Sequence, residues 1–205
     1  MKTMRFICLT VLLLTCSRAT AQRRYAPEPL EPKTRLEALQ LGTGTIIVRG
    51  AQRVGAARAQ GAGQVEVTAL EVIDTSNNQK ARGIAVTVAE GGERGRETTA
   101  FVDYDELEGL IKGFESMSRL DRTESQLPNF EASYRTKGDL VISLFGTRGG
   151  VTRCVVSTGW YEPAKLVVPV GESAPARINL TTEGAETLRF LLTAAKNRLD
   201  EAHAR

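Results

Sequence analysis

Apolar positions in the first half of the chain recur at every second residue, a period typical of β-strands. Three segments carry this pattern and are rich in β-branched residues: residues 45–54, 64–75 and 83–90. In the third, Ile84, Val86 and Val88 share one face, and smaller or polar residues take the other. Asn-, Gly- and Ser-containing stretches separate these segments and predict turns. We therefore expect about four antiparallel strands before residue 101.

The alternation slips within residues 65–73. Val65 and Val67 share a face, whereas Leu70 and Val72 take the opposite one. A β-bulge inserts one residue into a strand and reverses its facing pattern, so a bulge is expected here.

A helical period follows over residues 101–117, "FVDYDELEGLIKGFESM". Its apolar stripe consists of Leu107, Leu110, Ile111, Phe114 and Met117. The acids Asp103, Asp105 and Glu106 precede the stripe, and they suit either a helix start or a metal site. Asp103 and Glu106 have capping-box spacing, and acids favour the positive end of a helix dipole. A metal site would need further ligands from elsewhere, so we predict the helix start and no bound metal or cofactor.

The second half repeats this order of elements. Strand-like segments are expected at residues 130–136, 139–145, 151–157, 165–170 and 176–180. A helix then begins after Thr181, its predicted N-cap. Its apolar stripe consists of Ala185, Leu188, Leu191, Leu192, Ala195 and Leu199. The predicted fold class is α+β, with antiparallel sheets packed against two amphipathic helices.

The repeated order suggests a tandem ββββα duplication, with one unit at residues 39–120 and the other at 121–205. The capping box is not kept in the second unit, because Gly184 stands where Glu106 would be. Two sheets independently closed by helices therefore remain an alternative to duplication.

The first 21 residues have the features of a secretory signal peptide. Lys2 and Arg5 precede a short apolar run, and the small-residue site at 19–21 predicts cleavage after Ala21. A lipid anchor through Cys16 and a retained anchor are the less favoured alternatives. We expect an exported protein, periplasmic or secreted, without a stable transmembrane anchor. Residues 22–38 hold three prolines and many charges, and they predict a flexible linker.

Removal of the leader changes the charge balance. The chain has 27 basic and 24 acidic residues, and the leader carries three basic residues and no acid. The mature chain is therefore formally neutral, which disfavours nucleic acid as a partner. Cys154 would be its single cysteine, so no intramolecular disulfide can form. A buried apolar role is expected for Cys154, and a reactive or intermolecular thiol is the alternative.

The segments "DLVISLF", "VTRCVVS" and "ARINLTTEGAETLRFLLTAA" are similar in layout to the group of single-stranded-nucleic-acid-binding proteins that includes Pur-alpha repeats and Whirly proteins. The resemblance is one of pattern over about 130 residues, and no diagnostic motif supports it. It implies sheet-borne aromatic and basic residues that bind bases and phosphates. Here Phe130 and Tyr134 would share one strand face, with Arg135 on the other. The alternative role of both rings is to fill the core beneath a helix.

Trp160 and Tyr161 form a second candidate contact, in the predicted turn "TGWYEPAK". Such a pair suits a protein or carbohydrate partner, or it covers its own sheet. The glycine-rich stretches match no phosphate-binding motif, and His203 is the only histidine. No nucleophile–base pair can be assembled, so we do not expect an enzyme. The predicted function is an exported binding or structural module, compatible with a homodimer; the alternative is a single-stranded-nucleic-acid-binding protein.

Overall fold

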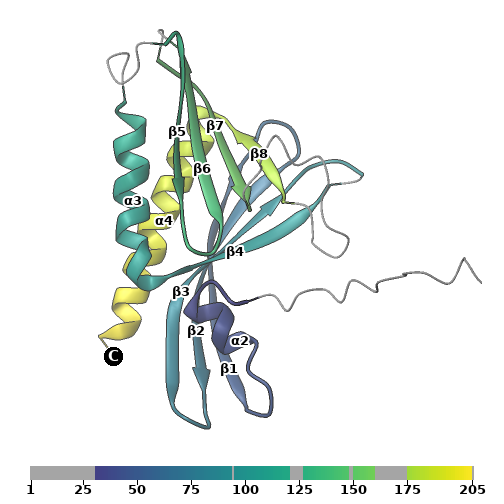
Figure 1. Ribbon diagram of the computed structural model, residues 1–205, viewed down its shortest axis with the longest axis vertical. Coiled ribbons are helices and arrows are strands. Elements are labelled where there is room, and N and C mark those ends of the chain that lie inside the picture. The colour runs from purple at the N-terminus through teal and green to yellow at the C-terminus, as the bar shows by residue number, and fades with distance from the viewer. Residues whose placement is uncertain (1–30, 94, 121–126, 148–149, 160–174, 205) are drawn as a thin grey trace, which may run out of the picture. The chain divides into compact units, whose positions relative to one another are not determined.

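The computed structural model describes residues 31–93, 95–120, 127–147, 150–159 and 175–204 (Figure 1). In the first half, the elements are α2 (Arg35–Gln40), β1 (Ile47–Arg58), β2 (Gln64–Asp74), β3 (Gln79–Ala89), β4 (Glu97–Asp103) and α3 (Tyr104–Ser118). In the second half, they are β5 (Asn129–Arg135), β6 (Leu140–Thr147), β7 (Gly150–Thr158), β8 (Arg177–Leu180) and α4 (Thr182–His203). The predicted α+β class is confirmed.

The strands form two four-stranded antiparallel sheets in sequence order, β1-β2-β3-β4 and β5-β6-β7-β8. A long helix follows each sheet, so both halves have the expected order of elements. An origin by duplication stays a prediction. The strand predicted at residues 165–170 lies outside the described residues.

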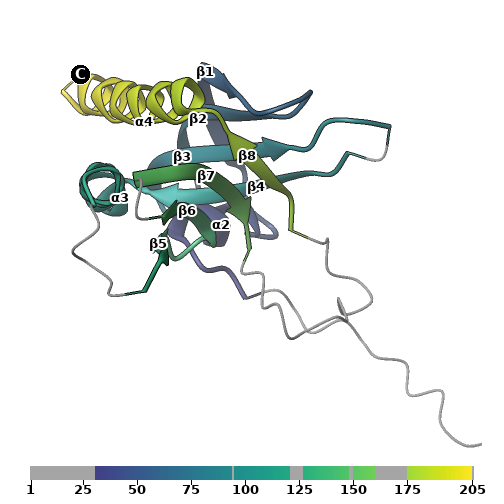
Figure 2. The same cartoon turned by 90° about the horizontal axis from the view of Figure 1, so that it is seen from above.

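The two halves share one hydrophobic core. Both long helices lie on the same side of the strands, next to each other (Figures 1 and 2). Although α4 ends the second half, it packs mainly on β1 and β2 of the first sheet. At the crossing, a Cβ atom on Gly55 would lie 2.6 Å from Cδ2 of Leu191, so only glycine lets the helix approach this closely.

The predicted apolar stripes are the buried faces of these helices. The buried residues are Leu107, Leu110, Phe114 and Met117 on α3, and Leu188, Leu191, Leu192, Ala195 and Leu199 on α4. Burial of each large side chain is worth about 1.5–3 kcal/mol. The predicted N-cap of α4 is confirmed, because the Thr181 hydroxyl accepts a hydrogen bond from the Gly184 amide at 3.0 Å.

The β-bulge predicted within residues 65–73 is wrong for that strand. β2 pairs with β3 without a break, and the register shift lies on β1 between Arg53 and Gly55. The facing pattern of β2 changes because its two ends are buried on opposite faces. Val65 and Val67 enter the main core, whereas Leu70 and Val72 enter a second cluster beneath α2.

That second cluster corrects the predicted linker at 22–38, which is wrong at its C-terminal end. Residues 35–40 form α2, which is capped by Thr34 through a complete capping box with Glu37. Leu36 is fully buried and packs with Leu70, Val72 and Ala81. The proline-rich composition ends at Pro32, and the apolar anchor Leu36 follows four residues later, within the same predicted segment.

The helix start predicted at Asp103 is confirmed, but the predicted capping box is wrong. Asp103 occupies the N-cap position of α3, and its side chain makes no bond to α3. Its carboxylate instead accepts hydrogen bonds from the backbone amides of Arg35 at 2.8 Å and Leu36 at 3.1 Å. Asp103 therefore joins the end of β4 to the first turn of α2.

Candidate ligand-binding groove

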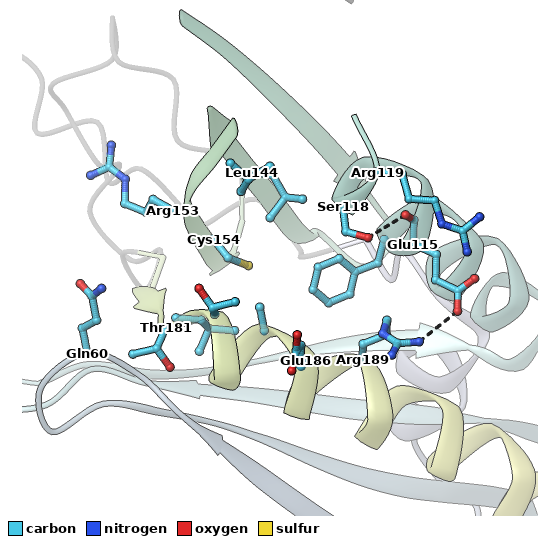
Figure 3. A pocket seen from close by; sticks show the side chains of 15 residues that line it. Gln60, Glu115, Ser118, Arg119, Leu144, Arg153, Cys154, Thr181, Glu186 and Arg189 are labelled. Atoms are coloured by element: carbon cyan, nitrogen blue, oxygen red, sulfur yellow. Dashed lines mark hydrogen bonds and ion pairs between the residues drawn. The ribbon is translucent and has the colours of Figure 1, made fainter. Parts of the chain in front are cut away.

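A groove of about 670 Å³ lies between the C-terminal end of α3 and the N-terminal end of α4 (Figure 3). β6 and β7 complete its lining through Leu144, Val151, Arg153 and Cys154. Its apolar lining includes Phe114, Leu144, Cys154 and Leu180, each at most 5 % exposed. Phe114 belongs to the apolar stripe of α3, and the other three lie on the inward faces of β6, β7 and β8, so the fold itself forms the floor of the groove.

Charged side chains line the rim. They are Glu115, Arg119, Arg153, Glu186 and Arg189. Nη1 of Arg189 lies 3.2 Å from Oε1 of Glu115, an ion pair that connects the two helices. The guanidinium carbon of Arg153 lies 4.9 Å from the centre of the Phe145 ring, and this cation–π contact positions it beside the opening.

Two of these arginines carry a charge that no described carboxylate neutralises, although Arg153 makes its cation–π contact with Phe145. Within the described part of the chain, neither Arg119 nor Arg153 makes an ion pair, and both are exposed. Figure 3 shows them at opposite ends of the groove, with Glu186 between them along α4. The groove therefore presents a cation at each end, and an apolar floor with one acid in its middle.

The Cys154 thiol lies at the floor of this groove. Burial raises its pKa to about 12, so the neutral thiol predominates at neutral pH. The predicted role as a buried apolar residue is confirmed for Cys154. A thiol in this state is a poor nucleophile, because the thiolate is the reactive form.

The structure places Phe130 and Tyr134 on one face of β5 and Arg135 on the other, as predicted. The Tyr134 ring packs against α3, where a Cβ atom on Gly113 would lie 2.3 Å from its Cδ2. Phe130 covers Gly146 on the neighbouring strand, where a Cβ atom would lie 2.3 Å from its Cζ. Both rings are thus half-buried against glycines, and Tyr134 also packs against the main core, the role that was the alternative to base stacking.

Arg135 does not face the groove. Its Nε donates to Oδ1 of Asp139 at 2.9 Å. Trp160 and Tyr161 lie outside the described residues. Of the predicted contacts that the structure describes, Phe130, Tyr134 and Arg135, none lines the groove.

The three acids near residue 104 interact with different groups, and two of these groups belong to Lys137. Asp103 binds the first amides of α2, and Oε1 of Glu106 accepts from the Lys137 amide at 3.0 Å. Asp105 lies 3.8 Å from the Lys137 ammonium at the surface. Across the ranges that the structure describes, no group of three or more His, Cys, Asp and Glu side chains is arranged to hold a metal ion.

A smaller cavity, of about 360 Å³, lies at the opposite end of α3. Of its lining residues, Arg82 bonds to Glu71 at 2.7 Å and to the ring of His203, and Asp103 binds amides of α2. Arg35 and Lys80 also line this cavity and make no ion pair among the described residues. The cavity has roughly half the volume of the groove between α3 and α4.

The groove residues could not be found by motif, because they come from five separate segments of the chain: residue 60, residues 114–119, residue 144, residues 151–154 and residues 180–189. Arg119 follows the last turn of α3, Arg153 is on β7, and Glu186 and Arg189 are on α4. The one local signal is position. Arg119 lies just beyond the apolar stripe of one helix, and Glu186 flanks the start of the stripe of the other.

Comparison of the chain with protein-family models, with curated proteins and with solved structures finds no match. The resemblance to Pur-alpha and Whirly proteins therefore stays a prediction from pattern. Among the described helices, none has both the length and the apolar character needed to cross a bilayer.

Proposed function

We propose that this protein is an exported, non-enzymatic binding module whose ligand occupies the groove between α3 and α4. The observation that carries the proposal is the combination of the groove's volume, its apolar floor and its charged rim. A volume of about 670 Å³ falls within the range of about 300–1,000 Å³ usual for ligand pockets. An apolar floor with a few charged groups around it is the common composition of such sites.

A binding role is favoured over catalysis by the chemistry of the lining. The groove holds arginines, glutamates and hydroxyl groups, together with a thiol that burial keeps protonated. Glu115 is engaged by Arg189, which leaves Glu186 as the groove carboxylate without an ion pair among the described residues. These groups are suited to orienting a bound ligand. They are less suited to general acid–base catalysis, which needs a proton donor and acceptor placed at the reacting atoms.

Nucleic-acid binding receives less support. Base stacking needs exposed aromatic rings, and Phe130 and Tyr134 are each packed against a glycine. Phe114, the aromatic ring of the groove, is only 3 % exposed. A single-stranded oligonucleotide retained at low salt and released as salt rises would nevertheless favour that alternative.

The test is a ligand screen by thermal shift on the purified protein and on Val151→Trp. Val151 lines the groove and is 42 % exposed, so a Trp there narrows the groove without entering the core. The matched control is Val48→Trp, since Val48 is 49 % exposed on β1 and does not line the groove. Ligands that stabilise the parent and Val48→Trp but not Val151→Trp support the proposal. Ligands that stabilise all three proteins equally contradict it.

A further inference from the structure

We infer that the groove selects a short extended peptide that carries an acidic residue at each end and apolar residues between them. This inference rests on the proposed function and names the ligand class of the same site. By its volume and apolar lining alone, the groove could bind many amphipathic molecules. The positions of the charged residues around it limit the classes of ligand that fit.

The two ends of the groove set the first requirement. Arg119 and Arg153 are exposed, make no ion pair within the described residues, and lie at opposite ends (Figure 3). A guanidinium binds a carboxylate in a planar, two-bond geometry. One anionic group could satisfy one arginine, whereas the separation of the two requires a ligand with two acids. Arg189 does not add a third site, because Glu115 already holds it.

The middle of the groove sets the second requirement. Glu186 lies between the two arginines along α4, so a central acid in the ligand would meet a like charge. The accessible apolar lining includes Val151, which is 42 % exposed, and the half-buried Ala185, and this surface favours apolar side chains.

Sugars and lipids fit this pattern less well. Carbohydrate recognition usually uses exposed aromatic faces, and the Phe114 ring is covered. A fatty acid has one anionic group, which would leave one arginine unpaired. An extended peptide places side chains at regular intervals and can present two acids and an apolar centre together.

The experiment probes a random hexapeptide array with the fluorescently labelled full chain at low salt. Bound sequences are expected to be enriched in Asp or Glu at two separated positions, with apolar residues between them. A consensus peptide from the array is then titrated by fluorescence polarisation. Arg119→Ala and Arg153→Ala are each expected to raise its Kd by about twofold to fivefold, the range for exposed ion pairs. Arg49→Ala, at an exposed arginine of β1 outside the groove, is the matched control and should leave the Kd unchanged.

Glu186→Gln tests specificity through a gain of binding, which a loss of protein stability would not produce. This variant is expected to accept peptides with a central acid that the parent rejects. Enrichment of basic or uncharged peptides overturns the inference, as does an absence of any bound peptide. If ligands of another class bind and Val151→Trp abolishes their binding, the proposed function stands and the peptide assignment fails.

Discussion

Replacement of Asp103 by Ala tests the connection between β4 and α2 that the fold revealed. Asp103 is 4 % exposed, and its carboxylate accepts amide hydrogen bonds at 2.8 Å and 3.1 Å from Arg35 and Leu36. Hydrogen bonds to a charged group contribute about 1.5–3 kcal/mol each, and loss of a helix cap costs about 0.5–2 kcal/mol. The first amide of α2 lies partly exposed and can bind water in the variant, which offsets part of this loss. We expect Asp103→Ala to lower the free energy of unfolding by about 2 kcal/mol.

Urea unfolding of the parent and the variant measures this difference. The control is Asp105→Ala, which removes an exposed acid from the first turn of α3 and is expected to cost less than about 1 kcal/mol. Amide hydrogen exchange then locates the effect. The amides of Arg35 and Leu36 are expected to exchange faster in Asp103→Ala, with the first turn of α3 unchanged.

Two results would refute this reasoning. Equal losses of stability in Asp103→Ala and Asp105→Ala would mean that burial and the α2 bonds add nothing. Faster exchange at the start of α3, with α2 unaffected, would mean that Asp103 caps its own helix after all.

Three further predictions concern packing, pH and thiol reactivity. Gly113→Ala is expected to lower the free energy of unfolding by about 1–3 kcal/mol, because its Cβ would lie 2.3 Å from the Tyr134 ring. Gly109→Ala, whose Cβ would lie 2.9 Å from the hydroxyl at the far end of the same side chain, should cost less, because alanine also favours the helix. Similar unfolding curves for the two variants would contradict this. Burial acts to raise the pKa of Asp139, but bonds from Lys33 and Arg135 outweigh it and lower the pKa below its ordinary 3.8. Its carboxylate therefore stabilises the fold above pH 3.8, and Asp139→Asn, which tolerates the positive φ of 61° at this position, should show a deficit in unfolding free energy at pH 7 that shrinks as the pH falls below 3.8. A deficit that stays constant to pH 3 would exclude this role. At pH 8, about one Cys154 thiol in 10,000 is ionised, because burial raises its pKa to about 12. Iodoacetamide should therefore leave the Cys154 peptide unmodified until the protein unfolds, which mass spectrometry can follow. Rapid labelling of the native protein would contradict this prediction.

The two long helices, α3 and α4, could be predicted from sequence because their signals are local. The apolar residues of α3 and α4 recur at three- and four-residue steps. This spacing places them on one face of each helix, and that face is the buried one. Thr181 caps the helix that it precedes, so this contact too lies within a few residues.

The errors arose where long-range packing decides the outcome. The carboxylate of Asp103 binds amides 67 and 68 residues earlier in the chain, a pairing that capping-box spacing cannot reveal. The facing pattern of β2 changes because α2 covers one end of one face and the main core covers the other face. A local rule assigned this change to a bulge in the strand itself.

The groove could not be predicted for the same reason. It depends on α4 crossing to the first sheet, and Gly55 on β1 permits that crossing. Nothing in the sequence near Arg119 or Arg153 indicates that the two would line one opening. Sequence reasoning considered Phe130 and Tyr134 either as ligand contacts or as core-filling rings, and the fold uses both to cover glycines.

The most direct test of the proposed groove is backbone amide chemical-shift mapping during titration with the consensus peptide from the array. The account predicts shifts confined to the last turn of α3, to β7 near Cys154 and to the first turn of α4. Residues of β5 and the far end of β1 should remain unchanged. Shifts that cluster on β5, around Phe130 to Arg135, with the groove unaffected, would contradict the assignment of the binding site.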